Sequence, residues 1–325
     1  MDRRDFLKGA AALPLVLHAS NSFAAGYPER NVDMIVPFPP GGQADLAARP
    51  IAQKLQELLG KSFVVDNRGG AGGAIGNAFA AKAAPDGYTL LMTLSSLAVL
   101  PEADRILGRP AQYETSQLVP VARVLADPTL LGVHAKAPWK NIQELVEDAK
   151  SRPGQIPYGS SGSYGTLHVS MAMFESAANM KMLHVPYKGA GPAVTDLLSG
   201  QILALASAPG VLKPHVDSGA VRVLANFGAK RVDSFPNLPT FQELGYKDVE
   251  FYIWAGLFAP AKTPEPVIKT LREAMKKAMA DPQTTKVYET AGSPPAYLDQ
   301  PEFKKFVDED SARLIAAVKK IGKVE

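Results

Sequence analysis

This chain of 325 residues contains no cysteine. Disulfides, thiolate catalysis, iron–sulfur clusters and cysteine-based zinc sites are therefore excluded. The absence does not argue against an oxidising compartment, because a chain of this length can bury enough apolar surface to be stable without disulfides. The hydrophobic fraction of 46% is that of an ordinary globular core, and the length favours two domains.

An excess of charge of one sign is also missing. The 35 basic residues nearly balance the 32 acidic ones, and they are dispersed along amphipathic segments. Nucleic-acid-binding proteins usually carry a clustered basic stripe instead. We therefore expect no nucleic-acid partner.

Long hydrophobic runs are lacking, and the apolar run that stands out lies at the N-terminus. Residues 10–17 are apolar, follow the pair Arg3 and Arg4, and precede a small-residue end at Ser22 to Ala24. The run is too short to cross a bilayer, which takes ~20 apolar residues. The pattern predicts an export signal over residues 1–24, cleaved near Ala24, and a mature periplasmic chain without membrane insertion. The paired arginines suggest the twin-arginine route, but Sec-type leaders can also carry them.

From residue 31 the chain alternates strand-like segments, glycine-rich turns and helical patterns. Strands are predicted over 32–36, 63–65 and 89–93, with helical spacing over 47–59 and a small-residue helix ending near residue 83. This order is βαβαβ, which predicts a parallel sheet covered by helices.

A second series of the same kind begins at residue 130. Asn141 followed by Glu144 is a helix-capping pattern and predicts a helix through Lys150. Further helices are predicted over 166–178 and up to Gly200. The predicted strands of this series are 130–133, 156–158, 183–185, 202–206 and 221–225.

The segment from residue 231 is rich in proline and then strongly helical, and its helices have no obvious sheet of their own. We expect them to return to the first sheet. Domain 1 then comprises residues 25–127 and 230–325, domain 2 comprises residues 128–229, and two crossings join them. The predicted fold class is α/β, with two parallel-type sheets flanked by helices. The cleft between two such domains is a common ligand site.

Catalytic signatures are weak throughout. The run from Gly70 to Gly76 resembles a dinucleotide fingerprint, but Ile75 stands where the third glycine belongs. No phosphate-binding P-loop and no hydrolase nucleophile motif occurs. The mature histidines lack the i, i+4 spacing of a helical metal pair. We therefore expect no catalysis, no cofactor and no metal.

Glycine- and serine-rich loops that open helices recur instead. Residues 39–42, 160–166 and 188–191 each follow a predicted strand. Helix N-termini offer unpaired backbone N–H groups and a partial positive charge, and the serine and threonine hydroxyls add donors. A single such loop is ordinary in any α/β fold. Three loops meeting at one cleft favour a site for a carboxylate-sized anion.

These segments resemble the Bug-type, or TctC-type, substrate-binding proteins of tripartite tricarboxylate transporters. The resemblance covers essentially the whole mature chain in order. It is carried by Tyr27-Pro28, 35–42, Asp45, Arg49, 67–73, 85–91, 158–160, 184–189, 238–245 and 260–264.

The resemblance implies a two-domain periplasmic-binding-protein (Venus flytrap) fold that closes on a small organic acid and passes it to membrane permease subunits. It also implies that backbone amides and bridging waters hold the ligand carboxylates. We expect a monomer. The ligand-binding residues assigned on this basis are Phe38, Pro39, Gly41, Gly42, Asp45, Thr93, Ser95, Ser96, Ser160, Ser161, Gly162, Tyr164, Gly165, Thr166, His168, Tyr187, Lys188, Gly189 and Ala190.

Two departures from the family's pattern bear on the ligand. Residues 200–203 lack an aspartate that members often have, and residues 94–97 lack a common asparagine. Both losses favour a more apolar or aromatic acid, for which Phe38, Tyr164 and Tyr187 are candidate stacking surfaces. The residues leave open whether the ligand is an aliphatic, aromatic or amino acid.

Two other functions stay open at this point. A binding protein of this kind can also present its closed form to a receptor kinase, as a ligand sensor. From a different class, the twin arginines and the incomplete glycine motif suggest an exported oxidoreductase that uses a nucleotide cofactor.

Overall fold

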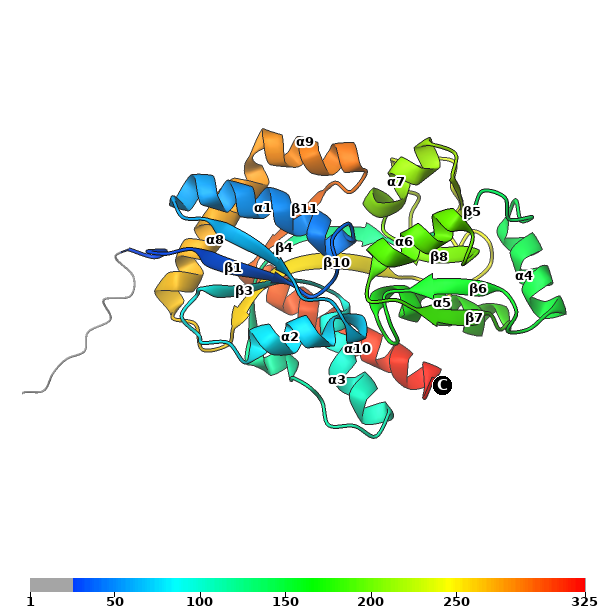
Figure 1. Ribbon diagram of the computed structural model, residues 1–325, viewed down its shortest axis with the longest axis horizontal. Coiled ribbons are helices and arrows are strands. Elements are labelled where there is room, and N and C mark those ends of the chain that lie inside the picture. Colours follow the sequence, from blue (N-terminus) through cyan, green and yellow to red (C-terminus); the bar gives the residue numbers. More distant parts are fainter. Residues whose placement is uncertain (1–25, 325) are drawn as a thin grey trace, which may run out of the picture.

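The computed structural model describes residues 26–324, so the predicted export signal lies outside the described residues. Two sheets lie side by side along the long axis of the molecule, each covered by helices (Figure 1). We call each sheet with its helices a lobe. The strands of the first lobe, in order across the sheet, are β11 (Pro295–Asp299), β4 (Leu118–Pro128), β10 (Tyr252–Pro260), β3 (Thr89–Leu94), β1 (Val32–Val36) and β2 (Phe63–Asn67).

The second lobe is built from one continuous stretch of chain. Its strands, in order across the sheet, are β7 (Leu183–Pro186), β6 (Pro157–Ser160), β8 (Ala204–Ser207), β5 (Leu130–His134) and β9 (Val221–Asn226). Its helices are α4 (Ile142–Ser151), α5 (Thr166–Ala178), α6 (Ala190–Ser199) and α7 (Pro209–Asp217). α4 begins as the capping pattern predicted, because the Asn141 side chain accepts a hydrogen bond from the Glu144 amide.

The helices of the first lobe come from both ends of the chain. They are α1 (Gln43–Leu59), α2 (Ala74–Ala81), α3 (Ser96–Ile106), α8 (Glu265–Ala280), α9 (Pro282–Ala291) and α10 (Gln300–Ile321), with short 3-10 turns at Ala71–Gly73 and Thr115–Gln117. α10 contacts α3 in its own lobe and α5 in the second lobe, so it spans the junction (Figure 1). α8 and α10 also contact β4, so these C-terminal helices cover the first sheet.

Each sheet combines a parallel core with reversed strands, and the predicted two-sheet α/β fold class is confirmed. β2, β1 and β3 are parallel, as are β7, β6 and β8. β10 runs antiparallel to β3 and β4, and β5 runs antiparallel to β8 and β9. β10 and β5 are the strands that enter from the other lobe. They must run away from the junction, whereas the parallel strands run toward it.

Two crossings connect the lobes at the junction. The first runs from β4 through Thr129 into β5, and the second runs from β9 through residues 227–251 into β10. The crossings are hydrogen-bonded to one another: Phe227 N donates to Thr129 O over 2.8 Å, and Thr129 N donates to Phe251 O over 3.1 Å. The division into domain 1 (residues 25–127 and 230–325) and domain 2 (residues 128–229) stays a prediction. Within residues 26–324, no helix is both long and apolar enough to cross a membrane.

Candidate functional site

The candidate site lies where the carboxyl ends of the parallel strands in the two sheets face each other. Loops from both lobes approach closely there, without room for side chains at several glycines. A Cβ placed on Gly162 would lie 2.8 Å from the Gly72 nitrogen, and one on Gly189 would lie 2.5 Å from Pro39 Cδ. Gly42 is more open, since its Cβ would lie 3.6 Å from Ala190 Cβ. The lobes are therefore in contact across the cleft.

A charged network fixes the loop between β1 and α1. Asp45 accepts hydrogen bonds from the Arg49 guanidinium at 2.8 and 2.9 Å, from the Asn67 amide at 3.0 Å and from Gly41 N at 3.1 Å. Burial alone would raise the Asp45 pKa, but these hydrogen bonds outweigh it and lower the pKa. Asp45 thus holds the loop in place, and its oxygens have partners already.

Several buried polar atoms at this junction have no hydrogen-bond partner among residues 26–324. They are Ser95 Oγ just before α3, Ser161 Oγ in the loop between β6 and α5, Thr166 Oγ1 at the start of α5, Thr129 Oγ1 at the first crossing, and Gln43 Oε1 at the start of α1. All five side chains are nearly inaccessible to solvent. A buried polar atom without a partner costs ~1–3 kcal/mol, so such atoms usually meet water or a ligand.

Three other predicted site hydroxyls are engaged within the protein. Thr93 donates to Asn77 Oδ1 over 2.9 Å, and Ser96 donates to Gly72 O over 3.2 Å. Ser160 Oγ lies 2.6 Å from His184 Nε2 and accepts a hydrogen bond from Gly162 N at 3.1 Å. These side chains shape the glycine-rich loops around the unpartnered hydroxyls.

His168 supports the loop that precedes α5. Its Nδ1 accepts a hydrogen bond from Tyr164 N at 3.0 Å, and its ring stacks on His184 with centroids 4.2 Å apart. Burial, with a smaller contribution from His184, lowers the His168 pKa to about 3, and burial lowers the His184 pKa to about 4. Both rings are therefore neutral near pH 7. They face a hollow of about 750 Å³ beside α10.

The three aromatic residues expected to stack on a ligand have other partners. Tyr164 Oη donates to Gly322 O over 2.8 Å and accepts from Val324 N at 3.0 Å, so it ties the C-terminal end to the α5 loop. Tyr187 Oη donates to Asp196 Oδ2 over 2.6 Å. The Phe38 ring lies against Gly73, where a Cβ would be 2.9 Å from Cζ.

A cavity of about 350 Å³ opens between the lobes next to this site. The second lobe contributes Gly162, Tyr164, Tyr187 and Lys188, all predicted site residues. The first lobe contributes Arg109, whose guanidinium pairs with Asp104 at 2.8 Å, along with the segments around Ala71 and Leu100. Lys188 and Arg109 are both exposed, so the cavity has cations on both sides.

Sequence reasoning missed three polar residues at the junction: Gln43, Asp127 and Thr129. The Gln43 amide donates to Asp127 Oδ2, and both side chains are buried. Burial raises the Asp127 pKa to about 7, although hydrogen bonds from Ser293 and Gln43 oppose the shift. A single acid and a threonine interrupting the apolar run Val124 to Leu131 were the available signal.

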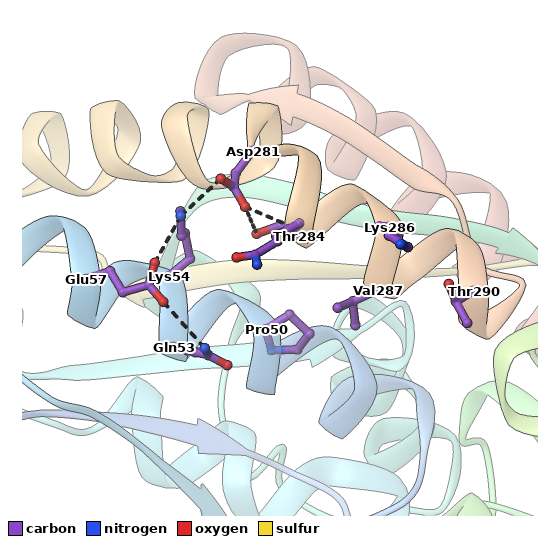
Figure 2. A pocket seen from close by; sticks show the side chains of 10 residues that line it. Pro50, Gln53, Lys54, Glu57, Asp281, Thr284, Lys286, Val287 and Thr290 are labelled. Carbon is purple, nitrogen blue, oxygen red and sulfur yellow. Dashed lines mark hydrogen bonds and ion pairs between the residues drawn. The ribbon is translucent and has the colours of Figure 1, made fainter.

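Another hollow, of about 520 Å³, lies between α1 and α9, away from the junction of the two lobes (Figure 2). Long surface side chains line it and pair with one another: Lys54 bridges Glu57 at 2.9 Å and Asp281 at 3.0 Å. It contains none of the predicted site residues. In the described part of the chain, no three His, Asp or Glu side chains gather closely enough to hold a metal ion.

Comparison with known proteins gives a consistent family. The profile of the family described as "Tripartite tricarboxylate transporter family receptor" matches residues 47–323. Protein BugT of Bordetella pertussis (strain Tohama I / ATCC BAA-589 / NCTC 13251) is 34% identical over 297 residues, covering 91% of this chain and 90% of BugT.

Solved structures are similar over the same range. The periplasmic binding protein BugD is 32% identical with a TM-score of 0.85, covering 91% of this chain and 98% of BugD. An R. palustris protein solved with adipate is 30% identical with a TM-score of 0.85, again over 91% of this chain and 98% of that chain.

Proposed function

This chain belongs to the tripartite tricarboxylate transporter receptor family, as the resemblance predicted, and we propose that it captures a small organic carboxylate between its two lobes. Its family and its structural neighbours are solute-binding proteins, not enzymes. The structure of the R. palustris relative holds adipate, which is a carboxylate of the proposed class.

The observation that carries this proposal is the set of buried, unpartnered hydroxyls in the loops that lead into α3 and α5 and at the first residue of α5. Thr166 is the first residue of α5 in the second lobe, Ser161 lies in the loop between β6 and α5, and Ser95 directly precedes α3 in the first lobe. Hydroxyls and free backbone N–H groups donate hydrogen bonds, and a carboxylate accepts them. A ligand bound there would contact both lobes and favour their closure.

Export and delivery complete the proposed role. The leader over residues 1–24 would place the mature chain in the periplasm as a monomer, where its closed form meets permease subunits of a tripartite tricarboxylate transporter. The glycine-rich run that suggested a nucleotide cofactor has a different place in the fold. A Cβ on Gly72 would lie 3.3 Å from Ser163 O, so this run packs against the second lobe.

Native mass spectrometry of protein purified without added ligand, followed by a thermal-shift screen of mono- and dicarboxylates, tests the proposal. A ligand that binds only the folded state adds RT ln(1 + [L]/Kd), ~2.7 kcal/mol at a hundredfold excess over Kd. At least one carboxylate should raise the melting temperature. Stabilisation by NAD or a flavin, with none by any organic acid, would overturn the proposal.

A further inference from the structure

We propose that Asp127 and Ser293 hold Gln43 as a hydrogen-bond acceptor in the cleft, so that the site selects carboxylates that also carry a hydrogen-bond donor. The ligand class would be hydroxy, amino or amide-bearing acids, as opposed to plain carboxylic acids. This inference rests on the proposed function and adds the direction of one further hydrogen bond, in which the ligand donates and Gln43 accepts.

The residues involved form a buried series of hydrogen bonds that links both lobes. Gly210 N, in the first turn of α7, donates to Ser293 Oγ over 3.1 Å. The Gln43 amide nitrogen donates to Asp127 Oδ2, and the Ser293 hydroxyl is close enough to Asp127 to lower the pKa of that carboxyl by hydrogen bonding. Gln43 and Asp127 are each 3% exposed and Ser293 is 0% exposed. Water therefore has little access to these hydrogen bonds.

The protons that each group carries determine the direction of these hydrogen bonds. Ser293 Oγ accepts from Gly210 N, and toward an ionised carboxylate, which has no proton, its hydroxyl can only donate. An ionised carboxylate has no proton to give, so Gln43 must present its NH2 group to Asp127. The Gln43 amide oxygen is then directed elsewhere, and it finds no partner among the described residues. An amide oxygen can only accept, so its missing partner must be a donor.

The position of Gln43 puts this acceptor beside the proposed carboxylate site. Gln43 is the first residue of α1, directly after Gly42, which faces Ala190 of the second lobe. Asp127 pairs with Ile253 near the cleft end of β4, two residues before Thr129. Both residues thus lie at the junction that carries the unpartnered hydroxyls.

A ligand complementary to the whole site would have two unlike ends. The hydroxyls of Ser161 and Thr166 and the free amides of α5 suit a carboxylate, which accepts. Gln43 Oε1 suits an O–H or N–H group, which donates. A ligand without that group would leave Gln43 buried and unpaired, which weakens binding by about 10- to 100-fold.

Matched ligands test this directly. Glutarate, 2-hydroxyglutarate and 2-oxoglutarate share one carbon skeleton. At carbon 2, glutarate has no hydrogen-bonding group, 2-hydroxyglutarate has a hydroxyl that can donate and accept, and 2-oxoglutarate has a carbonyl that can only accept. Benzoate, 4-hydroxybenzoate and 4-formylbenzoate form the corresponding aromatic set. Affinities are measured by calorimetry at pH 8, where Asp127 is ionised. In the set that binds, the hydroxy acid should have an affinity about tenfold or more above those of both analogues.

The variant Asp127→Asn gives a second, sharper readout at nearly constant volume. The new side-chain amide would accept from Ser293 through its oxygen and donate to Gln43 Oε1 through its nitrogen. The Gln43 amide would turn and offer N–H to the ligand. The ratio of affinities for the hydroxy and oxo acids should fall from tenfold or more toward one. Asp310→Asn is the matched control, because Asp310 is a buried aspartate bonded to Trp254 Nε1, outside the set of junction residues, and should leave the ratio unchanged.

The outcomes separate this inference from the function beneath it. Equal binding of the three ligands by the wild-type protein overturns the inference and leaves the carboxylate-binding function standing. An unchanged ratio in folded Asp127→Asn protein also overturns it. Failure of every carboxylate in both sets and in the earlier screen overturns the proposed function itself.

Discussion

At the scale of single residues, the cleft keeps polar atoms in a state that stability alone would not select. Ser95, Ser161 and Thr166 each bury a hydroxyl without a partner among the described residues. Such a group costs free energy in the protein without ligand and gains a hydrogen bond only when the ligand is present. Stability and affinity should therefore respond in opposite directions when these hydroxyls are removed.

Thr166→Val and Ser161→Ala test that opposition. Each variant should unfold at the same or a higher temperature than the wild type when no ligand is present, because an unpaired buried hydroxyl is lost. Each should bind its carboxylate more weakly by about 0.5–1.5 kcal/mol. Differential scanning calorimetry and titration calorimetry measure the two effects. Ser160→Ala is the contrasting variant: its hydroxyl contacts His184 and Gly162, so it should lose stability without ligand.

Asp127 should leave a signature in the pH dependence of stability. Its pKa is raised from 3.8 to about 7 by burial. A raised carboxyl pKa contributes stability that is complete below about pH 4 and is lost as pH rises through about 7. The free energy of unfolding of the wild type, minus that of Asp127→Asn, should therefore fall by up to about 4 kcal/mol between pH 4 and pH 8.

Urea unfolding followed by tryptophan fluorescence across that range gives the difference. His168 and His184 titrate in both proteins, so their contribution cancels in the subtraction. A difference that stays constant with pH would show that Asp127 does not carry the shifted pKa.

At the scale of elements, α10 joins the lobes through its C-terminal end. Tyr164 has a φ of +57°. Its hydroxyl donates a hydrogen bond to Gly322 O and accepts one from Val324 N. A non-glycine residue in this region of φ costs about 1 kcal/mol or more, so the surrounding contacts have to hold it. The tyrosine and the C-terminal segment therefore stabilise each other.

Tyr164→Phe should release that segment. Both hydrogen bonds disappear while the ring stays, so roughly 1–3 kcal/mol of stability should be lost and amide exchange should speed up over residues 318–324. Hydrogen exchange with mass spectrometry resolves this segment. Tyr288→Phe is the matched control, because its hydroxyl donates to Ala47 O within the first lobe. Equal exchange over residues 318–324 in wild type and Tyr164→Phe would contradict the role of the tyrosine.

The elements also show where sequence reasoning succeeded and where it could not. The helix over 166–178 and the strand over 32–36 match the structure, because apolar spacing and the neighbouring glycine-rich turns determine them. β10 was not predicted from the sequence, although Tyr252 to Pro260 is a nearly continuous apolar run. A fully buried strand has no alternation to reveal it, and its proline-rich surroundings resemble a loop.

The glycine-rich loops of the candidate site and the hydroxyls that they carry were predictable from local sequence, but contacts between distant segments were not. Glycine-rich loops before α1, α5 and α6 could be placed from local sequence, because each follows a strand and opens a helix. The pairing of Gln43 with Asp127 joins residues 84 positions apart, and Ser293 lies farther still along the chain. Only the fold brings such residues together, so periodicity and spacing carry no signal for their pairing.

At the scale of the whole molecule, the close contacts across the junction describe a closed arrangement. The wild-type protein should have a smaller radius of gyration in small-angle scattering when a carboxylate ligand is bound than without it, since the ligand favours the closed state. Gly162→Ala should not show this change, because its Cβ would meet the Gly72 backbone and its φ of +110° disfavours alanine.

Gly154→Ala separates the contact from backbone strain. Gly154 has a φ of +71° in the same lobe, but nothing lies within 4 Å of its Cβ position. This variant should close like the wild type. Compaction of Gly162→Ala upon binding, or an identical scattering profile for the wild type with and without ligand, would contradict the proposed closure.

The order of strands in the first sheet also dictates an order of assembly as the chain leaves the ribosome. β10 separates β4 from β3, so the strands of the first 128 residues cannot join into one sheet until residue 260 has emerged. The second lobe has every strand it needs by Asn226, and its two ends meet where Leu130 pairs with Asn226. We therefore expect the nascent chain to fold from its middle outward. β3 and β4, although made early, would wait with open edges for a strand made near the end of synthesis.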